Sequence, residues 1–213
     1  MQDHRMTTKP THTPTDHVGP DPRLGLAASA AAAARAIEAA TESGADLGEP
    51  TPCTEFTVEE LIEHIIVVAR RVVTIGNGGH FTEAPDHPVG SDWSTNFARE
   101  AAAIEPAWSD PAKLGQTYEV PWGEVPGFAL MLSYTAEFAA HTWDLSQAIG
   151  VEVDIDDAAL AGAAEAVTFI PAEVRNDPAI PFGPVVEAPT GASNLERIVT
   201  WVGRSLDWAP PAR

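Results

Sequence analysis

The stretch TVEELIEHIIVVARRVVTI, residues 57–75, decides the fold class because it carries both a helix start and a long apolar face. Thr57 followed three residues later by Glu60 is a capping box, in which each side chain accepts a backbone N–H of the other residue. Apolar residues then recur at intervals of three and four, namely Val58, Leu61, Ile62, Ile65, Ala69, Val72 and Val73. This pattern predicts an amphipathic helix from 57 to about 75, ended by the glycines that begin at Gly76.

Caps, prolines and glycines outline five further helices along the chain. Their predicted ranges are 23–43, 92–108, 126–150, Asp156 or Asp157 to Pro171, and a last helix that opens with a second capping box, Ser193 and Glu196. The predicted buried face of this last helix consists of Leu195, Ile198, Val199, Val202 and Leu206. Only Tyr118–Val120 has the character of a brief extended piece. The fold class predicted is therefore all-α, a bundle of four substantial and two shorter helices with long loops.

Composition and charge narrow the classes of function. The chain of 213 residues carries 12 Lys and Arg against 31 Asp and Glu, and a formal charge of −19 repels both nucleic acids and anionic membranes. Cys53 is the only cysteine, so no disulfide forms within the chain and a cytoplasmic location is expected. No apolar run reaches the roughly 18 residues of a transmembrane helix. Residues 1–22, rich in proline, histidine and threonine, are predicted to be a disordered tail, and residues 23–213 a single domain.

Three polar side chains are predicted at the inner edges of strong helices. Glu137 and His141 are four residues apart, hence about 40° apart around a helix axis, beside an apolar face. His64 lies at the edge of the apolar stripe of the 57–75 helix. A carboxylate and two imidazoles are natural ligands of a first-row metal. A solvent-facing Glu–His pair and a histidine bonded to a backbone carbonyl explain the same spacings, so the residues alone leave the metal site open.

Two runs of sequence resemble a known superfamily. Residues 52–64, PCTEFTVEELIEH, resemble the Pro-Cys-x-x-Trp-x-Val-x-x-Leu-x-x-His motif of actinobacterial DinB-like proteins, which belong with the mycothiol-dependent maleylpyruvate isomerase amino-terminal domain. Residues 137–145, EFAAHTWDL, followed by Gly150, resemble its second motif. The run 121–127, PWGEVPG, and the ending from Leu195 to Arg204 resemble an uncharacterised branch, so that the resemblance covers residues 24–208.

The resemblance implies a DinB-like four-helix bundle with a divalent metal, usually zinc, bound by a His, a Glu and a His. Matched residue by residue, these metal ligands are His64, Glu137 and His141. Three protein ligands leave a fourth position open, which in the thiol-dependent members activates a low-molecular-weight thiol such as mycothiol. Phe56 stands where the motif has tryptophan, and the residues after Gly150 are too few for the larger carboxy-terminal domain of maleylpyruvate isomerase.

The function expected from this resemblance is a zinc-dependent thiol S-transferase or isomerase-like enzyme that acts on a small electrophile. The alternative is a non-catalytic metal-binding module that senses a ligand or a partner. The partners expected are a small-molecule thiol and an electrophile, with no nucleic acid and no membrane, and a homodimer stays open.

Five other residues have two interpretations each or serve packing. Cys53 either faces the pocket or packs as a small hydrophobe. Asp144 either orients a ligand histidine or forms a salt bridge. Arg197 and Arg204, seven apart and so on one helical face, either bind the carboxylate of a cofactor or substrate or pair with acidic residues. Trp143 is directed away from the ligands and is predicted to pack.

Overall fold

The computed structural model describes residues 20–87, 90, 92–120, 123–170, 175 and 182–210, so most of the predicted tail, residues 1–19, lies outside the described residues. The all-α prediction is confirmed. The helices are α1 (Pro22–Glu42), α2 (Val58–Gly76), α3 (Trp93–Ala107), α4 (Gly127–Ile149), α5 (Ala161–Ala166) and α7 (Asn194–Trp201). Short 3₁₀ turns cover Phe81–Glu83, Pro111–Gly115, Asp157–Leu160 and Val167–Phe169.

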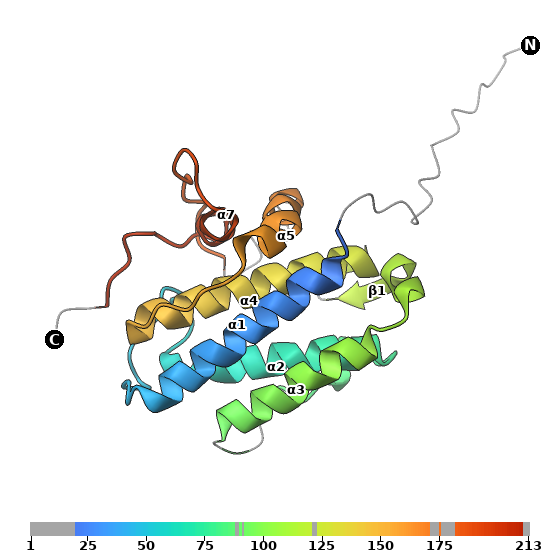
Figure 1. Ribbon diagram of the computed structural model, residues 1–213, viewed down its shortest axis with the longest axis horizontal. Coiled ribbons are helices and arrows are strands. Elements are labelled where there is room, and N and C mark those ends of the chain that lie inside the picture. The colour runs from blue at the N-terminus through green and yellow to red at the C-terminus, as the bar shows by residue number, and fades with distance from the viewer. Residues whose placement is uncertain are drawn as a thin grey trace, which may run out of the picture.

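Four long helices form the core, with α1 beside α4 and α2 beside α3 (Figure 1). The C-terminal ends of α2 and α3 meet, because the indole Nε1 of Trp108 donates to the carbonyl of Val72 at 2.9 Å and a Cβ at Gly76 would lie only 2.5 Å from that nitrogen. The Lys113 ammonium donates to the final carbonyls of both helices, Gly76 at 2.7 Å and Ala107 at 2.5 Å. Helices α2 and α3 therefore run parallel, and α4 runs in the opposite direction to α2 (Figure 1).

Local signals in the sequence explain where these helices begin and end. In the first capping box Thr57 Oγ1 accepts from the Glu60 N–H at 3.3 Å, while the Glu60 carboxylate accepts from the Thr57 N–H at 2.9 Å. The second predicted box, at Ser193, also forms. Gly150 ends α4 at φ 67°, a left-handed conformation that glycine adopts without strain.

Four sequence predictions about the elements need correction. The predicted helix from 156 to 171 is three short pieces, since α5 is flanked by two 3₁₀ turns. Helix α4 begins at Gly127, because Pro126 is its capping residue and ends a strand. Residues near 118 form a two-stranded antiparallel hairpin, β1 (Thr117–Val120) with β2 (Gly123–Pro126), rather than one extended piece. The last helix ends at Trp201, and two residues of its predicted buried face, Leu195 and Leu206, are only partly buried.

Helix α4 has apolar residues on two faces because it packs on two sides. Its large side chains, such as Met131 and Phe138, enter the core of the four-helix bundle. Its alanines, among them Ala136 and Ala140, face a second cluster formed with α5 and α7, which lie across α4 outside the bundle (Figure 1). No helix within the described ranges is long and apolar enough to cross a membrane.

Candidate metal centre

The loop that leads into α2 is held rigidly against the helix start. Pro50 and Thr57 form an isolated antiparallel bridge. The buried hydroxyl of Thr51 lies 2.9 Å from the carbonyl oxygens of both Cys53 and Phe56. This arrangement turns Cys53 into the interior and places the Phe56 ring over His64, with the ring centroids 4.8 Å apart and the planes 27° from parallel.

The three predicted ligands converge from two helices. His64 comes from α2, and Glu137 and His141 come from consecutive turns of α4. The His64 Nε2 and the Glu137 Oε1 are 3.3 Å apart, and the ligand atoms of all three residues lie within 4.8 Å of one another. His141 is buried, whereas His64 and Glu137 are half-buried, so one side of the group faces the surface.

The protonation states suit a metal site. Burial lowers the pKa of His64, and the neighbouring His141 lowers it further, although Glu137 opposes this shift. Burial raises the pKa of Glu137, but His64 and His141 outweigh burial, and the net shift is downward. A neutral imidazole and an ionised carboxylate are the forms that bind a metal ion.

The arrangement fits a divalent ion. Ligand atoms of a tetrahedral zinc with bonds of about 2.0–2.1 Å lie roughly 3.3 Å apart, close to the observed His64–Glu137 separation. The His64 Nε2 is buried and has no hydrogen bond to any described residue, although it faces the carboxylate. A bound cation would satisfy this nitrogen, and two imidazoles with one carboxylate form a donor set that zinc accepts.

Behind His141 lies a buried hydrogen-bonded chain. The His141 Nδ1 is 3.1 Å from the Asp144 Oδ2, which selects the tautomer that leaves Nε2 free to bind a metal. The Arg204 Nε lies 3.1 Å from Oδ1 and its Nη2 lies 3.0 Å from Oδ2 of the same carboxylate. Both interpretations of Asp144 therefore hold, because it accepts from a candidate ligand and forms a salt bridge.

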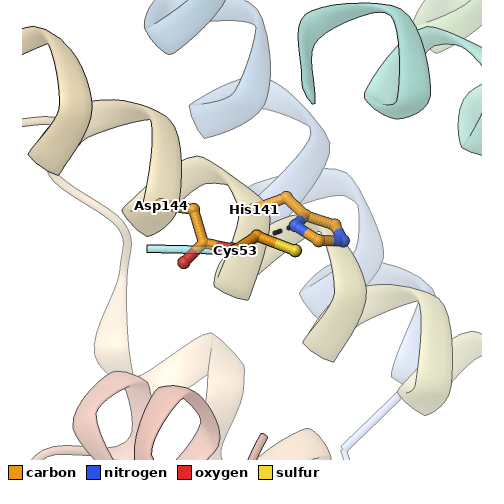
Figure 2. A group of neighbouring side chains, drawn as sticks. All are labelled: Cys53, His141 and Asp144. Atoms are coloured by element: carbon orange, nitrogen blue, oxygen red, sulfur yellow. Dashed lines mark hydrogen bonds and ion pairs between the residues drawn. The ribbon is translucent and has the colours of Figure 1, made fainter. Parts of the chain in front are cut away.

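Cys53 joins the same buried group (Figure 2). Its thiol, His141 and Asp144 have donor atoms within 4.8 Å of one another, which also resembles a ligand set. The Arg204 guanidinium already neutralises Asp144 there, and a second cation beside it would be repelled. Burial raises the pKa of Cys53 to about 11, so the thiol stays protonated and acts as a packed hydrophobe.

Other predicted site residues lie elsewhere. The prediction that Arg197 and Arg204 share one helical face is wrong, because α7 ends at Trp201 and Gly203 turns the chain at φ 95° before Arg204. Arg197 is exposed, and its guanidinium donates a long hydrogen bond to the Asn194 Oδ1 at 3.4 Å. Trp143 packs against the second cluster, as predicted. The pairing of Arg204 with Asp144 agrees with the second of its two interpretations from the sequence, in which the acidic chain supplies the arginine with a carboxylate.

Comparisons with known proteins agree with the motifs. Residues 26–119 match the sequence model of the mycothiol maleylpyruvate isomerase N-terminal domain. That segment includes Cys53, Phe56 and His64, whereas Glu137 and His141 follow it.

Similar proteins are found in Mycobacterium tuberculosis. Two uncharacterized proteins, one from strain H37Rv and one from strain CDC 1551, are each 29% identical to this chain over 163 residues, which is 75% of this chain and 86% of the relative. No solved structure matches the chain. The resemblance seen in the motifs is thereby confirmed over residues 26–119, where the chain is similar to the mycothiol maleylpyruvate isomerase N-terminal domain.

Proposed function

We propose that this protein is a cytoplasmic, zinc-dependent thiol S-transferase or isomerase-like enzyme that uses mycothiol or a similar thiol against a small electrophile. The observation that carries the proposal is the convergence of His64, Glu137 and His141, with a buried His64 Nε2 that has no hydrogen bond among the described residues. A divalent metal bound there would lower the pKa of a coordinated thiol toward neutrality and so supply the thiolate nucleophile.

The residues of the chain have distinct roles in this proposal. His141 is held by Asp144 so that its Nε2 faces the centre, and the buried Arg204 holds that carboxylate in place. His64 and Glu137 form the half-buried side, which leaves a route by which a small molecule reaches the open position. Phe56 covers one face of His64 and keeps water from that side of the ring.

The protein's own thiol is not the nucleophile in this proposal. Cys53 is fully buried, and its pKa of about 11 keeps the thiol protonated at neutral pH. Since the chain contains no second cysteine, a mixed disulfide on Cys53 would have no resolving partner in the chain. An added thiol must therefore supply the reacting sulfur.

Metal analysis tests the first half of the proposal. Untagged protein is incubated with zinc, desalted and assayed for metal, and close to one equivalent is expected. His141→Ala should lose most of the metal while the helical content is retained, because the apolar core of the bundle is unchanged. The matched control is His87→Ala, a change at an exposed loop histidine, which should keep the full equivalent. Wild-type protein with less than a tenth of an equivalent of any metal would rule out the metal centre.

Thiol consumption tests the second half. Wild type, Glu137→Gln and Cys53→Ala are compared on a panel of electrophiles with mycothiol, glutathione or no thiol. Turnover should require the thiol, survive Cys53→Ala and vanish in Glu137→Gln or with a chelator. A metal-loaded protein that turns over no electrophile would favour the alternative, a metal-binding module that senses a ligand.

A further inference from the structure

One arginine near the centre differs from all the others in the described part of the chain. Arg71 makes no hydrogen bond and no ion pair with any described residue, and it is half-buried in α2. Each other arginine there has a partner. These pairs are Arg23 with Asp21, Arg35 with the Asp154 carbonyl, Arg70 and Arg99 with Glu100, Arg175 with the Gly183 carbonyl, Arg197 with Asn194, and Arg204 with Asp144.

An unpaired guanidinium is unexpected in this chain. Acidic residues outnumber basic ones by 31 to 12, so a surface arginine has many carboxylates within reach. The charge of Arg71 acts on the exposed carboxylate of Asp86. That carboxylate is already hydrogen-bonded to His87 at 2.8 Å. A half-buried arginine also loses hydration that no protein group replaces among the described residues, which favours an external anion as its partner.

Arg71 lies beside the candidate metal centre. It follows His64 by seven residues in α2, so it is rotated by only about 20° around the axis and lies about 10.5 Å further along it. Since α4 runs in the opposite direction, Tyr134 is one turn from Glu137 on the side of Arg71. The charge of Arg71 acts on His64, Tyr134 and Glu137, in agreement with this position beside the centre.

We propose that Arg71 is the anion-binding residue of the pocket and pairs with a carboxylate of the small molecule that binds at His64, Glu137 and His141. This inference rests on the proposed function and narrows its substrates to molecules that carry a carboxylate a few ångströms from the reacting group. A planar guanidinium binds a carboxylate through two parallel hydrogen bonds, and the single charge of a carboxylate matches the single charge of Arg71.

A pair of matched thiols tests the proposal on Co²⁺-loaded protein. 3-Mercaptopropionate carries the carboxylate, and 3-mercaptopropionamide is nearly the same shape without the charge. Their affinities are measured from the thiolate-to-cobalt absorbance band. Wild type should bind the carboxylate thiol at least tenfold more tightly than the amide. In Arg71→Gln this preference should fall to within twofold while the affinity for the amide is unchanged, and Arg71→Lys should be intermediate.

The controls separate this proposal from the proposed function. Arg99→Gln, a change at an exposed and ion-paired arginine, should retain the wild-type preference. A wild type without the preference, or an Arg71→Gln variant that keeps it, would overturn the proposal. Absence of the cobalt band with either thiol would count against the metal centre instead. The Nε–H NMR signal of Arg71 in metal-free protein then decides, because a saturable shift with 3-mercaptopropionate supports the anion site and no shift overturns it.

Discussion

The two candidate histidine ligands sit in contrasting surroundings. His141 is 6% exposed, and its Nδ1 lies 3.1 Å from a carboxylate that Arg204 holds in turn. The side chain of His64 is 20% exposed, and its ring stacks on Phe56 at 4.8 Å. Apart from the approach to Glu137, the His64 ring nitrogens make no hydrogen bond within the described part of the chain. The centre thus has an inner half, defined by His141, Asp144, Arg204 and Cys53, and an outer half, defined by His64 and Phe56.

This difference indicates which property of the centre, metal affinity or access by a small molecule, depends on each half. A hydrogen bond is directional, so Asp144 sets both the tautomer and the rotation of the His141 ring. Stacking restrains only the plane of the His64 ring and leaves its tautomer free. The inner half depends on a segment 60 residues further along the chain, whereas the outer half is built by the adjacent loop. Metal affinity should therefore depend more on the inner half, and access by a small molecule more on the outer half.

The largest expected effect comes from breaking the inner half. Arg204→Met leaves the Asp144 carboxylate buried without its cation, and breaking such a pair costs about 3–5 kcal/mol of folding free energy. Urea unfolding followed by circular dichroism should show the midpoint falling with little change in slope. Adding Asp144→Asn to Arg204→Met should recover part of the loss. A single variant as stable as wild type would mean that water reaches this carboxylate.

A second variant tests whether Asp144 orients His141. Asp144→Asn has the same size but removes the anionic acceptor, and loss of such a partner typically lowers metal affinity about 10–100-fold. Competition with a chromophoric chelator, at a temperature well below unfolding of the variant, measures this change. The control is Asp154→Asn, a change at an exposed residue outside the centre, which should leave the affinity unchanged. Equal affinities in both variants would show that His141 needs no anionic acceptor.

A smaller effect is expected in the outer half. Phe56→Leu keeps an apolar side chain but removes the stacked ring, and an aromatic pair contributes about 0.5–1.5 kcal/mol beyond area burial. Zinc affinity should fall by about three- to tenfold, less than in Asp144→Asn. Phe56→Trp retains a ring and should restore most of the affinity. If Phe56→Leu weakened zinc binding more than Asp144→Asn, the ranking of the two halves would be reversed.

The helices were predictable wherever a short-range signal defined them. The Thr57–Glu60 box, the Ser193–Glu196 box and Gly150 act within one turn, so the sequence alone locates the corresponding helix ends. The segment 157–169 has a capping residue, Asp156, at its start, but no sequence signal marks the breaks within it. It is rich in alanine and its shape depends on packing against α4, so helical propensity alone did not reveal that it breaks into three pieces.

The residues of the candidate site also divide into those that short-range sequence patterns predict and those that they do not. Helical spacing and the motifs predicted His64, Glu137 and His141 as the ligands of one site, and the three residues are adjacent in the structure. The seven-residue spacing of Arg197 and Arg204 was misleading, because the helix stops between them and only tertiary packing brings Arg204 to Asp144. Arg71 carries no sequence signal, since its distinction is the absence of a partner among the described residues.

The smallest expected effect is on the pH dependence of the free energy of unfolding, which reports how well the inner half excludes water. Burial raises the pKa of Cys53 from 9.0 to about 11, so at pH 9 half of the unfolded thiols are ionised while almost all native thiols remain protonated. The unfolded state therefore binds fewer protons than the native state, and wild type loses roughly half a kcal/mol of stability from this group between pH 7 and 9. Cys53→Ala lacks this thiol, so its free energy of unfolding should fall less over the same range. Urea unfolding of both proteins at pH 7, 8 and 9 measures the difference, in which other titrating groups cancel. Parallel pH profiles would mean that the thiol ionises as readily in the native protein as in the unfolded chain, and that solvent enters the inner half.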